Sequence, residues 1–311
     1  MDIPPRSSQR KLIITVHGIR TFGNWQGRLE RLLPKDDARV WYHYTYGYLS
    51  ILGFVVPFVR WLIVRQFRES LLKRIAAHKD AQVYLVGHSF GTHLIGWALL
   101  GIKPSQRPVI HTIILAGSVL KIGFPWRDLM DEGTVGRVVN DCGTKDWVLL
   151  LNQMCVLFTG MAGRVGFVAM TDSRRFVQRF FPFGHSGYFE SVGGADDSFM
   201  RAKWLPLLLS EADPEVPDRN RPTTLDGVTL FMINNADPIK LMVASIIPLT
   251  LFFTYYGLYQ REKTAKEQER IAREDETRQR ELAQKNERIA RSLSPDSRKL
   301  HVLGSRPALG Q

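Results

Sequence analysis

Cysteine is scarce in this chain, which has only Cys142 and Cys155 among its 311 residues. An apolar stretch separates the two, so they show neither the spacing of metal ligands nor the pattern of a disulfide framework. Such sparing use of cysteine is typical of proteins that fold in a reducing compartment. We therefore expect the main domain to lie in a reducing, cytosolic setting.

A secretory signal is missing as well. The N-terminus reads Met-Asp-Ile-Pro-Pro, and no apolar run follows the basic residues near it. A signal peptide needs such a run of about 7 to 15 residues after a basic start. The sequence therefore offers no evident route for exporting a large folded domain.

Acidic residues are outnumbered by basic ones. There are 42 Lys and Arg against 30 Asp and Glu, which gives a formal net charge of +12. This balance is compatible with a nucleic acid or with an anionic membrane surface. The basic residues are scattered, however, and no DNA- or RNA-binding motif accompanies them. We therefore expect no nucleic-acid partner and favour a membrane.

The pattern of residues 10–212 predicts one α/β domain. The chain is long enough, and with 44% hydrophobic residues apolar enough, to bury a sizeable core. Short β-like runs alternate with helical ones, which is typical of a mostly parallel sheet with helices on both faces. The predicted strands are Leu12–Val16, Val40–Tyr46, Val83–Val86, Ile110–Ala116 and Val135–Asn140.

The remainder of the chain differs in composition. Residues 213–239 begin with a stretch rich in Pro, Asp, Arg and Asn and are predicted to be a linker. Residues 240–260 contain nineteen consecutive residues without a charge, Leu241–Tyr259, which predict a transmembrane helix. The alternative is a buried helix of the soluble domain. Residues 261–292 predict a charged, solvated helix with i,i+4 ion pairs, and residues 293–311 are predicted to be disordered.

A second apolar stretch, Leu49–Val64, is interrupted by Pro57 and Arg60 and leads into a basic helical segment. The simpler interpretation is a helix of the domain that precedes the strand Val83–Val86. The alternative is a surface helix partly embedded in a membrane, with Trp61 and the arginines at headgroup level.

Two signals disagree about the orientation of the span. Lys and Arg are denser after Tyr259 than before Leu241, which would put the C-terminal tail in the cytoplasm. A domain of this size without a secretory signal is hard to translocate, and the charges of the tail nearly cancel. We therefore expect a membrane-anchored protein whose main domain is cytoplasmic.

The most informative motif is Gly-His-Ser-Phe-Gly at Gly87–Gly91. It follows the strand Val83–Val86 and opens the helical stretch Thr92–Leu100, which is the context of a G-x-S-x-G nucleophile elbow. Glycines are needed because a turn this tight crowds any side chain against the neighbouring strand and helix. Ser89 is therefore the candidate nucleophile.

A serine nucleophile needs a general base and an acid, which follow it along the chain in the order Asp or Glu, then His. His185 is the only histidine that lies after the elbow, inside the domain and away from a predicted strand, in a glycine-flanked loop. The acid is expected after the strand Val135–Asn140, where Asp141 and Asp146 both qualify. We choose Asp146 because the turn at Gly143 lets its carboxylate reach back towards the histidine. Its alternative role is that of a helix N-cap.

Acyl transfer also needs two backbone N–H donors to stabilise an oxyanion. Phe90, directly after the nucleophile, supplies the first. The strand Leu12–Val16 runs into His17-Gly18-Ile19, so the Ile19 amide is the expected second donor, with Arg20 as the alternative.

With Val16-His17-Gly18, the elbow, Gly143-Thr144-Lys145-Asp146 and Gly184-His185-Ser186 in place, the chain resembles the α/β-hydrolase superfamily, and within it the lipase-like serine esterases. The resemblance covers roughly residues 10–212. It implies an eight-stranded, mostly parallel sheet, a covalent acyl-enzyme, no metal and no cofactor. The chain departs from the usual pattern because the strand before the histidine is represented only by Gly166–Thr171, and no lid domain is evident.

The leading interpretation is a membrane-associated serine hydrolase that cleaves a lipid or other acyl ester through Ser89, His185 and Asp146. The alternative is a catalytically silent hydrolase fold that serves as an interaction platform at a membrane. Several aromatic residues either line an acyl pocket or simply pack in the domain. These are Phe22, Trp25, Phe90, Phe183, Tyr188 and Phe189.

Overall fold

The computed structural model describes residues 10–19, 24–34, 38–46, 51–168, 174–189, 199–209, 232 and 235–293. The chain divides into two compact units, Met1–Met242 and Val243–Gln311.

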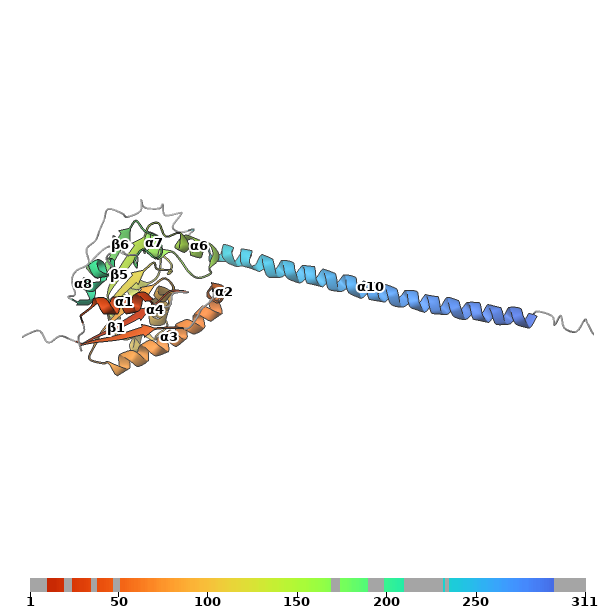
Figure 1. Ribbon diagram of the computed structural model, residues 1–311, viewed down its shortest axis with the longest axis horizontal. Coiled ribbons are helices and arrows are strands. Elements are labelled where there is room, and N and C mark those ends of the chain that lie inside the picture. Colours follow the sequence, from red (N-terminus) through yellow and green to blue (C-terminus); the bar gives the residue numbers. More distant parts are fainter. Residues whose placement is uncertain are drawn as a thin grey trace, which may run out of the picture. The chain divides into compact units, whose positions relative to one another are not determined.

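One sheet of six strands forms the centre of the first unit (Figure 1). Every neighbouring pair is parallel, and the order across the sheet is β2-β1-β3-β4-β5-β6. The predicted α/β class is therefore confirmed. The strands are β1 (Lys11–Val16), β2 (Arg39–Tyr44), β3 (Gln82–His88), β4 (Ile110–Ala116), β5 (Val135–Gly143) and β6 (Phe176–Phe181).

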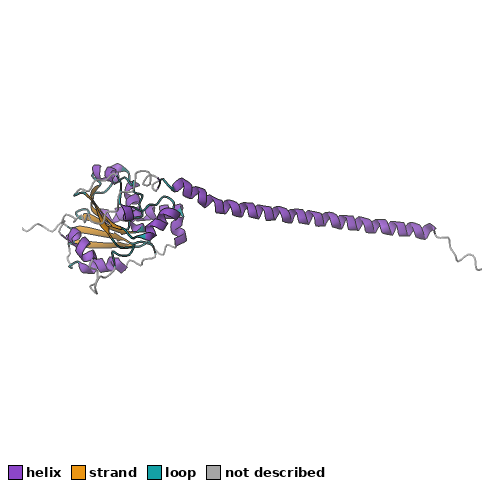
Figure 2. Cartoon of the chain, turned by 90° about the horizontal axis from the view of Figure 1, so that it is seen from above, coloured by secondary structure: helices purple, strands orange, loops and turns teal. Residues whose placement is uncertain are grey.

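Helices cover both faces of this sheet (Figure 2). Successive residues of a strand point to opposite faces, so Leu12 and Ile14 of β1 belong to one core cluster and Ile13 belongs to the other. The first cluster is covered by α2 (Ile51–Val55), α3 (Pro57–Ala77), α4 (Phe90–Leu100), α5 (Trp126–Asp131) and α7 (Ala162–Val165). The second is covered by α1 (Asn24–Leu32), the π-helical turn η2 (Met200–Trp204) and α8 (Leu205–Leu209). A 3-10 turn, η1 (Pro104–Gln106), precedes β4, and α6 (Trp147–Cys155) follows β5.

The strand that precedes the histidine loop is β6, not Gly166–Thr171 as the sequence analysis expected. Gly166 instead ends α7 with a φ of 88°, a left-handed conformation that glycine adopts without strain. Residues 169–171 lie outside the described residues. The described residues therefore form six strands, where the resemblance implied eight.

The stretch Leu49–Val64 folds, from Ile51 onwards, as α2 and most of the first half of α3. Helix α3 buries Ile63, Val64, Phe67 and Leu71 against the sheet and leads into β3. The interpretation as a helix of the domain therefore describes this segment, although several side chains at its N-terminal end are exposed.

Helix α10 (Asp237–Leu293) begins in the first unit. From Val243 onwards it forms the described part of the second unit. The helix thus begins inside the range expected to be a linker. Within the described part of the chain it is the one helix long and apolar enough to cross a membrane, and its most apolar window is not buried. Beyond Tyr259 its surface has i,i+4 ion pairs such as Arg273–Glu269 and Arg280–Glu276. Residues 294–311, for which we expected disorder, lie outside the described residues.

Candidate active site

The order of the strands changes direction between β1 and β3. The chain passes from β1 to β2 on one side and then returns across β1 to β3 on the other. Such a switch point is where open parallel sheets bind ligands, because the following loops diverge there. The segment His17–Ile19 follows β1, and Ser89 follows β3.

Ser89 stands at a sharp turn between β3 and α4, with φ 52° and ψ −122°. A positive φ in a residue other than glycine costs about 1 to 3 kcal/mol and persists only where the surroundings enforce it. Here the Ser89 N–H donates to Ala116 O at 2.9 Å, and the Thr92 N–H donates to Ser89 O at 3.0 Å. The motif at Gly87–Gly91 therefore adopts the strand, turn and helix arrangement of a nucleophile elbow.

The glycines of the elbow let α4 approach the sheet closely. A Cβ atom on Gly91 would lie 2.2 Å from Val16 O, and one on Gly87 would lie 2.7 Å from the Cδ1 atom of Ile95. The loop after β1 therefore lies directly beside the elbow. A Cβ atom on Gly18 would lie 2.8 Å from Ser89 Cβ, so glycine is also needed there.

Replacing Gly91 by Ala is expected to destabilise the first unit by about 1 to 3 kcal/mol, the usual cost of overpacking. The clash is with backbone, which cannot move aside as a flexible side chain can. Gly27→Ala in α1 is the control, because its Cβ would meet only Arg31 Nη1 at 3.5 Å. There alanine should raise the free energy of unfolding by up to about 1 kcal/mol, because it favours the helix more than glycine does. Urea unfolding of the two full-chain variants in detergent measures both, and equal effects would contradict the packing argument.

The histidine and one carboxylate predicted for the site are joined by a hydrogen bond. His185 Nδ1 lies 2.7 Å from Asp146 Oδ2, and Asp146 is completely buried. An ionised carboxylate only accepts, so this bond puts the ring proton on Nδ1 and leaves Nε2 to act as a base. The other oxygen, Oδ1, accepts from Leu149 N at 3.1 Å and caps α6. The two alternative roles of Asp146 therefore coexist, one on each oxygen.

A second contact ties the histidine loop to the elbow. His88, the residue before the nucleophile, has its Nε2 atom 3.0 Å from His185 O. Burial, assisted by the neighbouring His185 ring, lowers the pKa of His88 to about 3, so the ring is neutral and donates from Nε2. Gly117, with φ 56°, leaves room for the loop, since a Cβ there would be 3.3 Å from His185 Nδ1.

Ser89 Oγ and His185 are not hydrogen-bonded to each other within the described residues. Catalytic hydrogen bonds of enzymes without substrate are commonly long and tighten only in the complex. The two residues are nevertheless connected indirectly, because His88, which precedes Ser89, is hydrogen-bonded to His185 O.

Asp141, the alternative acid, faces a different partner. Its carboxylate accepts from Arg179 Nε at 2.5 Å, from Arg179 Nη2 at 2.8 Å and from Trp204 Nε1 at 2.8 Å. All three residues are buried, so Asp141 belongs to an ion pair inside the domain and not to the histidine. Sequence reasoning missed Arg179. The available signal was a lone basic residue in the otherwise uncharged run Phe176–Phe181.

The two expected oxyanion donors lie beyond the carboxyl ends of the paired strands β1 and β3. Phe90 is the first residue of α4, and the first amides of a helix have no partner within it. Ile19 follows Gly18 in the turn after β1, while Arg20 lies outside the described residues. The His17 ring orders this turn: it stacks on Tyr46 with centroids 4.4 Å apart, and Tyr46 OH donates to His17 O at 3.1 Å. Burial lowers the pKa of His17.

Three of the six aromatic residues considered for an acyl pocket serve in packing. Trp25, Phe90 and Tyr188 are buried in the two core clusters. The Tyr188 hydroxyl donates to Asp141 O and accepts from Gly117 N, both at 3.0 Å, which joins the ends of β4 and β5. Phe183 and Phe189 are half-buried, and Phe22 lies outside the described residues. In the described part of the chain, no three His, Cys, Asp or Glu side chains gather as a metal site would require.

Comparison with known proteins adds a distant structural similarity. The chain matches no protein-family model, and it matches no curated protein. Among solved structures it is similar to one described as a novel cutinase-like protein from Cryptococcus sp., with 15% identity and a TM-score of 0.28. The similarity covers 58% of this chain and 78% of that chain.

Proposed function

We propose that this chain is a membrane-anchored serine hydrolase that cleaves an acyl ester through an acyl-enzyme on Ser89. The observation that supports this most directly is the pair formed by His185 and the buried Asp146, at 2.7 Å, on the same sheet edge as the strained Ser89 turn. A histidine oriented by a buried carboxylate is the arrangement that serine hydrolases use to activate their nucleophile.

In the proposed reaction, Ser89 Oγ attacks the ester carbonyl and gives its proton to His185 Nε2. Asp146 stabilises the imidazolium that forms, and the amides of Phe90 and Ile19 stabilise the oxyanion. One such donor is worth about 2.7 to 4 kcal/mol of the barrier. The alkoxide leaves with the proton from His185. Water then attacks the acyl-serine by the same route, releasing the carboxylic acid and free Ser89.

The membrane part of the proposal is supported by the apolar segment of α10. Its nineteen uncharged residues, Leu241–Tyr259, extend for about 28 Å at 1.5 Å per residue, close to the thickness of a hydrocarbon core. An anchor of this kind favours an acyl ester that lies in or at the membrane.

A fluorophosphonate probe tests the function, because it reacts only with an activated serine. We expect the purified full chain to be labelled and the adduct to map to the peptide that contains Ser89. Ser89→Ala should abolish labelling, while Ser70→Ala, on α3 and hydrogen-bonded to Tyr42, should not change it. A folded wild-type protein that is not labelled in detergent or in vesicles would instead favour a catalytically silent platform.

A further inference from the structure

A group of apolar side chains is exposed on two neighbouring parts of the first unit. Phe58 and Trp61 on α3, and Trp147 and Met154 on α6, are each more than half exposed, at 64%, 53%, 63% and 67%. Patches of this kind on a soluble domain mark a contact surface. We call the group the apolar rim. Its members are Val55, Val56, Phe58, Trp61, Leu62, Trp147, Leu150, Leu151, Met154 and Phe158.

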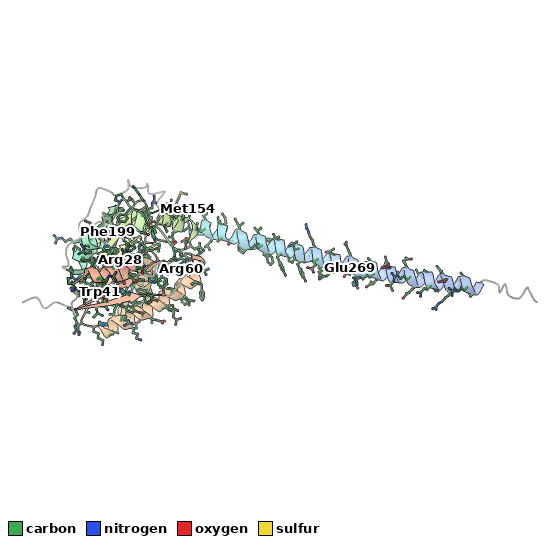
Figure 3. The ribbon with its side chains drawn as sticks, in the orientation of Figure 1. Arg28, Trp41, Arg60, Met154, Phe199 and Glu269 are labelled. Atoms are coloured by element: carbon green, nitrogen blue, oxygen red, sulfur yellow. The ribbon has the colours of Figure 1, made fainter. Side chains whose placement is uncertain are left out.

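A buried arginine connects the two parts of the rim. Arg60 Nη1 donates to Val55 O at 3.1 Å and to Phe54 O, and its Nη2 donates to Leu157 O at 2.5 Å. The segment after α6 is thereby fixed against α2 and the start of α3. Arg60 and Met154 lie at the same end of the first unit in Figure 3.

The first turn of α10 is attached to this same place. Asp237 forms an ion pair with Lys121 at 2.5 Å and accepts from Phe158 N at 3.0 Å. Lys240 Nζ donates to Val156 O at 3.1 Å, and Lys240 is itself buried. These contacts all lie within the first unit. The ion pairs and hydrogen bonds outweigh the effect of burial on Asp237, so the pKa of its carboxyl is lowered and it stays charged.

The backbone at this attachment is strained. Phe158 has a φ of 59°, and with Ser89 it is one of two residues other than glycine with a positive φ among the described residues. Strain of this type persists only where neighbouring contacts enforce it. The bond from the Phe158 N–H to Asp237 is such a contact. The first turn of α10 is therefore held to the domain by specific contacts.

The chain enters its apolar segment at Leu241, one residue after the buried Lys240. If that segment spans a bilayer, Lys240 lies at headgroup level, and so do Val156 and Phe158, which contact the same turn. Exposed Trp side chains favour this depth, since their amphipathic rings sit at the interface of the hydrocarbon and the headgroups. A lipid surface is therefore the occupant that suits the rim.

We propose that the apolar rim docks into the surface of the membrane that anchors α10. This inference rests on the membrane anchor of the proposed function and extends it to the catalytic domain. The proposal also identifies the membrane as the source of the substrate. Helix α6 begins directly after Asp146, and α2 follows the end of β2, so the rim lies on the carboxyl edge of the sheet with Ser89. Docking would present the site to acyl esters of membrane lipids without their passing through water.

A cleft that borders the rim fits the same partner, since Trp61 and Phe158 belong to both. It has a volume of about 310 Å³ and lies between α3 and α4. Trp61, Trp97 and Phe158 form its aromatic walls, and Arg68 contributes a guanidinium group. An aromatic cleft with a cationic group suits an anionic lipid headgroup whose chain continues into the bilayer.

The experiment uses the full chain in vesicles of phosphatidylcholine and phosphatidylglycerol, with and without a mixture of lipids that carry a doxyl quencher near the headgroup and lipids that carry one near the end of the acyl chain. Cys155 is exposed and is replaced by Ser, whereas Cys142 is buried and stays. A single fluorophore is then attached at Phe58→Cys or at Met154→Cys. Val109→Cys is the control because Val109 is 71% exposed but precedes β4, at the amino edge of the sheet. Leu251→Cys reports on the span.

We expect quenching at positions 58 and 154 to exceed quenching at 109 several-fold and to approach that at 251. Quenching at 251 with none at 58 and 154 would overturn the docking and leave the anchor intact. No quenching at any position, 251 included, would overturn the anchor and the docking with it. Energy transfer between labelled copies at 58 or 154, without quenching, would show that a second copy of the chain covers the rim.

Discussion

Replacing Asp146 by Asn is expected to lower kcat/KM for an acyl ester by about 10⁴-fold while the protein stays folded. Asparagine keeps an oxygen for the Leu149 amide, and it is as good an N-cap as aspartate, so α6 should persist. Its NH₂ group, however, would face His185 Nδ1. That nitrogen must then accept, the ring proton moves to Nε2, and the base that Ser89 needs is lost.

The hydrolysis of a nitrophenyl ester and the rate of fluorophosphonate labelling both measure this effect. Asp128→Asn is a matched control, because Asp128 is exposed in the first turn of α5 and takes no part in the site. A variant Asp146→Asn that retained more than about a tenth of the wild-type kcat/KM would show that Asp146 does not orient the base.

Replacing Asp141 by Ala is expected to lower the free energy of unfolding by about 3 to 5 kcal/mol, because it leaves the buried Arg179 without its counter-ion. The Trp204 indole N–H would lose its acceptor as well. The cost arises from desolvated polar groups and not from a missing catalytic role, so the fraction of protein that remains folded should still be labelled at Ser89.

Urea unfolding of the full chain in detergent measures the loss. The double variant Asp141→Leu with Arg179→Met should recover most of it, since a buried ion pair replaced by apolar groups of similar volume is often close to neutral. Glu69→Ala breaks the exposed pair with Arg65 and should cost no more than about 1 kcal/mol. The structural role would be contradicted if Asp141→Ala lowered the free energy of unfolding by less than about 1 kcal/mol. It would also be contradicted if the variant lost labelling while it was still folded.

The predictions from sequence were most accurate where the signal is local. The α/β class and five strands follow from apolar runs of the correct length, and the Ser89 turn follows from a motif whose glycines have a steric reason. The strand before the histidine loop was misplaced, because an apolar stretch after Gly166 resembles a strand as closely as Phe176–Phe181 does. Pairing with β5 selects the second, and pairing is a long-range property.

The choice between Asp141 and Asp146 illustrates the same division. Both follow one predicted strand within six residues, and local chemistry makes either a plausible partner for a histidine. In the sheet, β5 continues to Gly143, and the β5–β6 register sets Asp141 opposite Arg179. That ion pair occupies Asp141, and the turn beyond β5 carries Asp146 to His185. No spacing rule in the sequence contains this information.

The sequence by itself determined the elements that depend on neighbouring residues: the α/β pattern, the Ser89 turn, the glycine-flanked His185 loop and the uncharged segment Leu241–Tyr259. Periodicity, turn chemistry and the length of an apolar run are local, so they can be recognised without a fold. The tertiary structure determined which residues contact each other. It paired Asp141 with Arg179 and Asp146 with His185, and it fixed the first turn of α10 beside the apolar rim. These contacts join residues far apart along the chain, and only the packing of the sheet and its helices brings them together.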